Sequence, residues 1–559
     1  MRDPRRKPAA HPRRAASAPP VAAAPPGVLP SLVTGLVALG LYLALAPAVA
    51  GDKDSSEFTL VLARLGCAHP TGYPLYTLLG HAFVTLLHAA GVGWDRAANA
   101  WSAVGGAVAM GLLHALAARL LAREGVAARP AAVIALLPVA AFALNPLVTI
   151  ETTLAEVNAF HLAWVMGAML LLLAGMDARR GSDAAGAARR RPVADDPRRF
   201  AVAGLVAGLG LAHHATSVLV IVPAGLALRV QAARARRLAA ATLAAAALGA
   251  ALPLTSYAWI AWRAFHPGMP QWAALDASWL GVWRHITGFE YRAYLGHWAP
   301  SAVQRAAMAK YLWPWFASFA TGALLWAWRG RGTPGPVRAA WVAIIAIATC
   351  YGFSYGVPDP SSYFLPPFLL ACAAAPAAFA PWAGKPALRP AAALLALALL
   401  AQDAWWFHIG RERETAYLAF ERRIHAMWVA VPFDSGFVFW SSDMVHRLHK
   451  YQWLDGEKPR IEAINPLTLT FDAPRAAFIH RHGFEPADRG RLDARLSAAH
   501  PSSIDAFSQV VSEEVVTEVN AGTRLPVVRF MPEVPQMTLL DKPGADSTRG
   551  HPAGAAPPR

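Results

Sequence analysis

Three carboxylates lie close together just after the first apolar run of the chain, at Asp52, Asp54 and Glu57. If a helix begins at Asp54, Glu57 lies one turn further along on the same face. Ser55 and Ser56 suit the start of such a helix, where its dipole favours acidic side chains, so a solvated and well-capped helix explains the cluster. A carboxylate held at a membrane surface beside a second acid can also take a proton from an acceptor hydroxyl. The cluster is therefore a candidate site for general-base catalysis.

A turn follows this cluster, with the sequence Gly66-Cys67-Ala68-His69-Pro70-Thr71-Gly72-Tyr73-Pro74-Leu75-Tyr76. Two prolines and a glycine predict an extended, turning backbone. That path presents His69, Tyr73 and Tyr76 near the start of the next helix. The three side chains could anchor a turn at the membrane interface, or they could donate hydrogen bonds to a phosphate or a sugar hydroxyl. Spacing alone leaves both interpretations open.

The composition indicates a membrane protein. Of the 559 residues, 55% are hydrophobic and 15% are charged, whereas soluble proteins carry about 25% charged residues. Many of the 20 tryptophans stand at the ends of apolar runs, as interface anchors do. The formal net charge of +16 is also typical of nucleic-acid-binding proteins. Here, however, the basic residues cluster in short links between apolar runs, so we expect the lipid bilayer as a partner and no nucleic acid.

Basic residues also orient the chain, because cytoplasmic loops are enriched in Lys and Arg. Residues 1–27 are rich in Pro, Ala and Arg and should form a disordered cytoplasmic tail. The run 28–50 is long enough to cross a bilayer, so residue 51 emerges outside. The strongest inside signal is the Arg-rich link between residues 176 and 200. Residues 200–228 have basic flanks at both ends, which predicts two short helices bent near His213 and His214.

The predicted fold is mainly α, a polytopic transmembrane helix bundle over residues 28–408 with about 10–12 membrane segments. The segment 73–91 is apolar, but a crossing there would put the Arg-rich end at 119–129 outside. We therefore expect an interfacial or re-entrant helix within a first outside loop, 51–96. Further apolar runs lie at about 97–121, 130–150, 157–176, 238–262, 311–328, 339–356, 362–381 and 389–408.

The residues after the last apolar run should lie outside the membrane. Residues 409–540 are expected to form a small α/β domain. Apolar runs predict strands at 436–440 and 460–464, and helical spacing predicts a helix at 443–454. Residues 541–559 are of low complexity and should form a disordered tail.

Polar residues elsewhere supply further candidates. His213 and His214, at the inferred bend, could bind a donor or could hydrogen-bond a backbone carbonyl freed there. Asp359 stands in a Pro-Asp-Pro turn, and a plain turn residue is the favoured interpretation. The outside loop 263–310 offers cationic groups for a phosphate, since arginine matches phosphate oxygens well. They are Arg263, Arg284, His285 and Arg292.

Other motifs argue against several classes of site. His446 and His449 have helical spacing, but no third metal ligand is visible. The three cysteines form no CxxC pair, so neither a disulfide framework nor a zinc knuckle follows. Because no P-loop sequence occurs, ATP hydrolysis lacks support.

Two motifs of the first outside loop resemble a known family. Asp54-Ser55-Ser56-Glu57-Phe58, followed by Ala68-His69-Pro70-Thr71-Gly72-Tyr73-Pro74-Leu75, resembles the signature of a domain-of-unknown-function family of protein O-mannosyltransferase-like membrane proteins. That family typically has D-S-G-E-F and then A-H-P-P-G-Y-P-L. Ser56 replaces the glycine and Thr71 replaces the first of two prolines; neither departure removes a charged group, although Ser56 narrows how closely a substrate can approach.

The resemblance extends over most of residues 30–465 through less specific motifs. Ala155-Glu156-Val157-Asn158-Ala159-Phe160 is similar to the family's E-V-Y-A-L-N, and the segment from Gly208 to Thr216 to its G-L-x-L-G-N-H-x-T. Tyr355 to Asp359 and Tyr363 to Pro366 resemble its Y-x-x-x-D and Y-F-L-P. Trp440 to Asp443 and Tyr451 to Leu454 resemble the family's soluble end.

The resemblance implies a GT-C-type glycosyltransferase, which uses a polyprenyl- or dolichyl-phosphate sugar and carries a catalytic acid in its first non-cytoplasmic loop. If the roles known in the family are assigned to the matching positions, Asp54 is the general base and Glu57 is a second carboxylate that orients acceptor or sugar. Asp52 has no counterpart in the motif and is the third candidate. Deprotonation of an acceptor by Asp54 predicts inversion at the anomeric carbon. The expected substrate-binding residues are His69, Tyr73, Tyr76, Glu156, His213, His214, Arg292 and Asp359.

The expected partners are a polyprenyl-phosphate-linked sugar, for which the family suggests mannose, and an extracytoplasmic acceptor, which could be a protein Ser/Thr, a glycan or a lipid. No metal site is predicted, although the two carboxylates could hold a divalent cation. The Arg- and Ala-rich composition suits a high-GC bacterium, with the chain in the inner membrane and its C-terminal domain in the periplasm. The alternatives are a transporter or flippase of lipid-linked sugars, with many spans and buried polar residues, and a non-enzymatic cell-envelope assembly protein.

Overall fold

The computed structural model of the chain describes residues 27–52, 54–184, 197–233, 240–266, 268, 275–296, 298, 300–357, 359–500 and 504–542. The predicted disordered tails, 1–27 and 541–559, lie outside the described residues except for positions 27, 541 and 542. Much of the Arg-rich signal used for orientation also lies outside them. This applies to Arg189, Arg190, Arg191, Arg234, Arg236 and Arg237.

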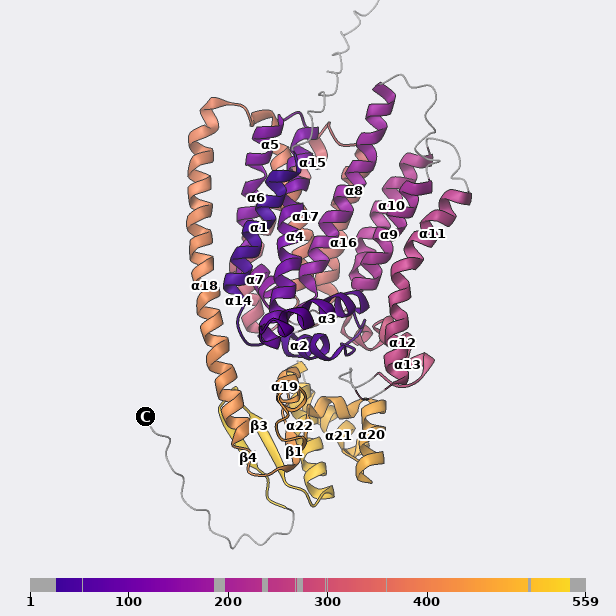
Figure 1. Cartoon of the computed structure of the whole chain (residues 1–559), viewed down its shortest axis with the longest axis vertical. Helices are drawn as coiled ribbons and strands as arrows, with labels where there is room; N and C mark the ends of the chain where they lie inside the picture. The colour runs from indigo at the N-terminus through magenta and orange to yellow at the C-terminus, as the bar shows by residue number, and fades with distance from the viewer. Residues whose placement is uncertain are drawn as a thin grey trace, which may run out of the picture.

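Most of the chain forms a helix bundle, as predicted (Figure 1). Six described helices or joined helices are long and apolar enough to cross a membrane, or seven if a pair bent by 82° between residues 128 and 153 counts as one span. The other predicted segments are shorter helices of the same bundle. The bundle helices are α1 (Val28–Leu45), α4 (Trp94–Arg123), α5 (Ala128–Ile134), α6 (Leu136–Ala143), α7 (Pro146–Thr153), α8 (Asn158–Ala184), α9 (Pro197–His213), α10 (Val218–Ala233), α11 (Ala240–Leu254), α15 (Trp313–Arg329), α16 (Gly335–Ser354), α17 (Ser361–Ala374) and α18 (Arg389–Val429).

Helix α4 is the centre of the bundle: most of its side chains are buried, and it packs against α1, α7, α8 and α17. Its C-terminal end meets the end of α15, because Glu124 accepts hydrogen bonds from the backbone N–H groups of Arg331 and Gly332. Helices α5 and α18 begin at the same end of the bundle, away from the C-terminal unit (Figure 1). Several links assigned to the cytoplasm thus gather at one end, as the positive-inside rule requires.

The bend predicted near His213 and His214 is confirmed. Helix α9 ends at His213, a short 3-10 turn (Ala215–Ser217) follows, and α10 begins at Val218. The partner of α9 is α11, and glycine lets the two backbones approach closely. A Cβ atom added at Gly208 would lie 2.3 Å from the carbonyl oxygen of Ala250. This pairing holds the His213–His214 corner at the end of the bundle that faces the C-terminal unit (Figure 1).

The first outside loop folds into two short helices, α2 (Ser55–Arg64) and α3 (Pro74–Ala89), that lie across the lower end of the bundle (Figure 1). The predicted interfacial segment 73–91 corresponds to α3. Asp54 occupies the N-cap position of α2, so the expected helix through Glu57 is present. Three further short helices border this end: α12 (Ala258–Phe265), α13 (Trp279–Ile286) and α14 (Ala302–Tyr311).

The last bundle helix does not stop at the predicted domain boundary of 408. Helix α18 runs unbroken to Val429, because residues 409–429 contain helix formers and no proline, and the one glycine there, Gly410, lies beside Leu45 in the bundle. The soluble unit that follows begins with β1 (Ser435–Phe439). Its other elements are β2 (Arg460–Ile464), β3 (Val527–Met531), β4 (Gln536–Leu539), α19 (His446–Leu454), α20 (Asp472–His482), α21 (Arg489–Ala499) and α22 (Ile504–Gly522).

The soluble unit is a three-layer α/β structure whose sheet has the strand order β2-β1-β3-β4. Strand β1 pairs in parallel with β2 and β3, and β4 is antiparallel to β3. Because side chains alternate along β1, Val438 faces the layer of α19 and the end of α18, whereas Phe437 and Phe439 face α20 to α22. The predicted strands and helix of residues 436–464 are therefore confirmed.

Buried ion pairs attach the soluble unit to the bundle. Lys450 of α19 contacts Asp95 at the start of α4, with 2.6 Å between Nζ and Oδ2, and Glu421 of α18 at 3.0 Å. Arg447 pairs with Glu421 at 2.7 Å and also donates to the carbonyl oxygens of Ala50 and Gly51. We call these contacts the interdomain lock.

Candidate functional site

A cavity of about 760 Å³ lies between the soluble unit and the end of the bundle that faces it. This volume suits a small-molecule or cofactor-sized ligand. Seven of the ten predicted site residues line it, although they come from five separate segments of the chain. These residues are Asp54, His69, Tyr73, Glu156, His214, Arg292 and Asp359.

Asp54 and His69 form the acidic corner of the cavity, and Glu57 lies behind them. The backbone N–H of His69 donates to one carboxylate oxygen of Glu57 at 2.7 Å, and the Nδ1 atom lies 2.7 Å from the other oxygen. The Nε2 atom of His69 points toward Asp54, 3.8 Å from its Oδ2. Glu57 is buried and does not line the cavity, and its carboxylate contacts the imidazole of His69; its expected role in orienting acceptor or sugar stays a prediction.

The charges around His69 keep its imidazole protonated. Burial lowers the pKa of His69, but the negative charges of Glu57 and Asp54 and the hydrogen bond to Glu57 outweigh burial and raise the pKa to about 9. At neutral pH, the corner therefore holds an imidazolium between two carboxylates. The loop that carries His69 is fixed at Gly72, where φ is +80° and an added Cβ atom would lie 2.4 Å from the side chain of Ile260.

This corner is also where a divalent cation would bind. Asp54, Glu57 and His69 each offer one ligand atom within 4.8 Å of the others, the one such group found among the described residues. Carboxylate oxygen and imidazole nitrogen fit ions such as Zn²⁺ or Mn²⁺. A cation would have to displace the proton of His69, because both occupy the same nitrogen lone pair. At His446 and His449, the two Nδ1 atoms lie 3.4 Å apart and no such group forms.

Two predicted substrate-binding residues do not line the cavity. Tyr76 is 2% exposed and packs among Phe58, Trp101 and Phe160, because the start of α3 turns it into the core beneath α2. The Nε2 atom of His213 lies 3.1 Å from the carbonyl oxygen of Val157. The interpretation of this histidine as a partner for a backbone carbonyl therefore fits the geometry better than donor binding does.

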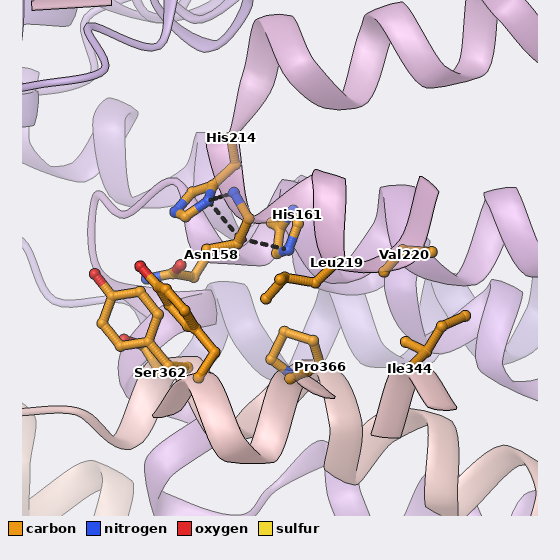
Figure 2. Close-up of a pocket in the computed structure, with 12 residues that line it drawn as sticks. Asn158, His161, His214, Leu219, Val220, Ile344, Ser362 and Pro366 are labelled. Carbon is orange, nitrogen blue, oxygen red and sulfur yellow. Dashed lines mark hydrogen bonds between the residues drawn. The ribbon is translucent and has the colours of Figure 1, made fainter. Parts of the chain in front are cut away.

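A small recess of about 20 Å³ opens beside the cavity at the corner between α9 and α10. Figure 2 shows His214 and His161 there, joined by hydrogen bonds that run through Thr216, whose Oγ1 lies 2.7 Å from His214 and 3.2 Å from His161. Asn158 lies on the cavity side of the recess and donates to Glu151 at 2.8 Å. The other side is apolar, with Leu219, Val220, Ile344 and Pro366.

Tyrosines form one wall of the cavity. Tyr351 and Tyr355 stack at a centroid distance of 5.5 Å, and Tyr363 lies edge-on to Tyr355 at 4.8 Å. Tyr291 and Tyr294 continue the wall from the loop after α13. Such a wall offers flat apolar faces and hydroxyl groups together, which suits a sugar ring. Sequence motifs included Tyr355 and Tyr363 but did not identify the wall, since its members are far apart in the chain.

The other predicted polar residues divide into those on the cavity and those away from it. Arg292 is exposed on the lining and lies over the ring of Phe289 at 4.6 Å. Asp359 lines the cavity and also accepts a 2.6 Å hydrogen bond from the hydroxyl of Ser361 at the start of α17, as a turn residue would. Arg263, Arg284, His285 and Asp52 do not line the cavity.

The soluble unit supplies a wall that the sequence did not predict. It carries Ser441, Ser442 and Asp443, which follow β1, and Asn465, which follows β2. Because β1 and β2 are parallel, their carboxyl ends meet at one edge of the sheet, and this edge faces the cavity. Burial and the charges of Asp54 and Glu57 raise the pKa of Asp443 to about 6.

One family model matches the chain. Residues 54–237 match the family described as the N-terminal domain of the protein O-mannosyl-transferase TMEM260. Residues 54–237 are therefore similar to an O-mannosyltransferase-type domain. The domain includes the acidic corner, the loop of His69 and the His213–His214 turn, and it confirms the resemblance inferred from the motifs. The match therefore indicates a glycosyltransferase.

Two solved structures are similar to most of the chain. The oligosaccharyltransferase of Archaeoglobus fulgidus, in a complex with Zn and sulfate, is 15% identical, with a TM-score of 0.47 over 89% of this chain and 67% of its own. ArnT from Cupriavidus metallidurans, bound to undecaprenyl phosphate, is 12% identical, with a TM-score of 0.43 over 89% of this chain and 92% of its own. Scores below 0.5 identify no function here, and no curated protein matches the sequence.

Proposed function

We propose that the chain is an inverting glycosyltransferase that moves a sugar, mannose by its family, from a polyprenyl-phosphate donor to a Ser or Thr hydroxyl of an extracytoplasmic protein. The observation that supports this proposal is the position of Asp54. Its carboxylate opens onto a cavity at the outer end of the bundle, where the head group of a lipid-linked donor would lie. The chain would then reside in a bacterial inner membrane with its soluble unit in the periplasm.

In the proposed reaction, the acceptor hydroxyl gives its proton to Asp54 while its oxygen bonds to the anomeric carbon. The bond from that carbon to the phosphate oxygen breaks, and its electron pair leaves with the polyprenyl phosphate. A phosphate is a weakly basic leaving group, so no acid is needed to expel it. The chain must position the acceptor and neutralise charge on the phosphate, for which Arg292 is on the cavity lining.

His69 acts in this scheme as a positioning residue. Its imidazolium lies 3.8 Å from Asp54 and is held from behind by Glu57, so the two acids differ in role. Asp54 is open to the cavity and can receive a proton, whereas both oxygens of Glu57 are already bonded to His69. The tyrosine wall, with Glu156 on the adjoining lining, supplies contacts for the sugar.

The test is transfer of label from radioactive polyprenyl-phosphate mannose to a Ser/Thr-rich protein in membranes that contain the chain. Asp54→Asn should lower the rate by roughly a hundredfold to ten-thousandfold, the usual contribution of a general base. Asp52→Asn is the matched control, because Asp52 accepts a hydrogen bond from Tyr417 and is not on the cavity. Full activity of Asp54→Asn at equal expression would refute the assignment of the base. Movement of labelled lipid across the membrane without a mannosylated product would favour a transporter.

A further inference from the structure

The cavity wall that comes from the soluble unit differs in chemistry from the tyrosine wall. It presents hydroxyl groups, an amide, a carboxylate and two apolar side chains, from Ser441, Ser442, Asp443, Asn465, Leu467, Thr468, Phe471 and Ser508. The hydroxyl groups of Ser441 and Ser508 lie 3.0 Å apart, which joins the β1 edge to α22. We call these residues the C-terminal wall. It faces the acidic corner across the cavity, so a ligand bound on it would lie beside Asp54.

Asp443 is the charged group of the C-terminal wall, and its carboxylate has a fixed orientation. One oxygen accepts a 3.1 Å hydrogen bond from the side-chain amide of Asn465. That amide is held in turn, because its oxygen accepts from the backbone N–H of Leu467 at 3.1 Å. Among the described residues, no hydrogen bond to the second oxygen of Asp443 is found. Protein surrounds the cavity, but the side chain of Asp443 is exposed to the space inside it. Its second carboxylate oxygen is therefore available to a ligand in the cavity.

The interdomain lock sets the position of Asp443 relative to Asp54. Arg447 lies one helical turn after Asp443 and donates to the carbonyl oxygen of Gly51, three residues before Asp54. Lys450, on the same helix, reaches Asp95 of α4. Because these ion pairs are buried, separating the two carboxylates would leave charges unpaired at a large cost. The C-terminal wall is thus held at a defined place opposite the proposed base.

We propose that the C-terminal wall is the acceptor subsite, where Asp443 binds a polypeptide segment and holds its Ser or Thr hydroxyl toward Asp54. This assignment rests on the proposed function. A carboxylate with neighbouring amide and hydroxyl groups matches the N–H groups and basic side chains of a peptide. Leu467 and Phe471 offer apolar contacts for peptide side chains, whereas the flat rings that suit a sugar belong to the tyrosine wall.

The charge of the cavity gives this subsite a specificity. Five acidic residues line the cavity, whereas the positive groups on the lining among the described residues are Arg292 and the imidazolium of His69. The acids are Asp54, Glu151, Glu156, Asp359 and Asp443. Like charges repel strongly in a confined site, so acidic peptides should be rejected. We therefore expect acceptors whose residues beside the modified Ser or Thr are neutral or basic.

The experiment uses purified full-length chain, polyprenyl-phosphate mannose and three peptides that carry one Thr flanked by Lys, Gln or Glu. For the wild type, the KM should be lowest for the Lys peptide and highest for the Glu peptide. Asp443→Asn keeps the shape and the bond to Asn465 but removes the charge. It should raise the KM for the Lys peptide roughly tenfold to a hundredfold, as loss of a charged hydrogen bond does, and leave the KM for the donor at the wild-type value.

Charge reversal and a surface control complete the design. Asp443→Lys should reverse the order of the Lys and Glu peptides, whereas Asp493→Asn, on the exposed surface of α21, should not change it. Equal KM values for all three peptides in the wild type, or an unchanged order of KM values in Asp443→Lys, would overturn the acceptor subsite. Transfer of mannose to the peptides would still support the proposed function in that case. No transfer by the wild type to any peptide would overturn both.

A second measurement does not depend on variants that must fold. A Thr peptide with a benzophenone group beside the Thr is photolysed with the wild-type chain, and the labelled fragments are mapped. Label within 441–471 is expected, and unlabelled peptide in excess should remove it. Label confined to the tyrosine wall or to the outer surface of the soluble unit would overturn the assignment.

Discussion

The imidazolium of His69 should make the first outside loop sensitive to pH in a defined window. His69 has a pKa of about 9 in the folded chain, above its ordinary value of 6.5. A raised pKa means that the folded state binds the proton more tightly, so its stabilisation is fully present below pH 6.5 and is lost as the pH rises through 9. The difference corresponds to roughly 3 kcal/mol, on the basis of about 1.4 kcal/mol for each tenfold change in proton affinity. His69 is 9% exposed, so solvent screening takes away little of this energy.

Cys67 provides a local probe of this energy. Its thiol is 1% exposed, lies two residues before His69 and contacts His285 at 3.6 Å, so a thiol reagent reaches it only when the loop opens. In a Cys350→Ala background, which removes the exposed cysteine, the opening equilibrium should increase on the order of a hundredfold between pH 6.5 and pH 9.5. The measurement is the labelling rate of Cys67 in detergent across this range.

A matched variant separates loop opening from the titration of the thiol itself. His69→Gln can still donate a hydrogen bond to Glu57 but cannot gain a proton, so its labelling rate should follow only the ordinary pH dependence of a thiol. It should open more readily than the wild type at pH 6.5, because Glu57 has lost its buried counter-ion. Identical pH profiles for the wild type and His69→Gln would refute the argument that His69 is held protonated by its neighbours.

Two predictions concern the scaffold. Lys450→Met leaves Asp95 without its buried partner and should lower the free energy of unfolding by about 3–5 kcal/mol. Arg489→Met removes an exposed pair with Asp472 and should change the free energy of unfolding by less than about 1 kcal/mol. Thermal unfolding in detergent measures both variants. Gly208→Leu should force α9 away from α11 and destabilise the bundle by at least about 1–3 kcal/mol. Gly225→Leu on α10 places its side chain in open space and should be tolerated. Similar unfolding temperatures for the two variants would contradict the close packing of α9 against α11.

Local patterns in the sequence predicted the elements that depend on short-range chemistry. The helix through Asp54 and Glu57 follows from capping residues and spacing. The bend at His213 follows from basic flanks that one crossing cannot satisfy. The strand β1 and the helix α19 follow from apolar periodicity in a soluble segment. Each of these features is decided within about twenty residues, which is the range over which hydrophobic pattern and capping act.

The remaining features depend on contacts between distant parts of the chain. The spacing did not show that the carboxylate of Glu57 turns inward to the loop of His69, because nothing in the sequence fixes the direction in which this side chain points. The sequence did not show that α18 continues past residue 408, because hydropathy falls where the helix leaves the apolar region, whereas the helix itself continues to Val429. Asp443 was not predicted as a site residue, because the docking of the soluble unit onto the bundle is what places it opposite Asp54.

The interdomain lock is better explained by positioning than by stability. A buried ion pair gains little over a well-packed apolar contact, because removing two charges from water offsets their attraction. Five polar groups nevertheless meet here: Asp95, Glu421, Arg447, Lys450 and the hydroxyl group of Tyr451. Apolar side chains could hold the units together, but they would allow sliding, whereas the bonds from Arg447 to the Ala50 and Gly51 carbonyls permit one register. Transfer between two substrates on opposite walls requires such a register, because a misplacement of about 1 Å can lower the rate by about a hundredfold.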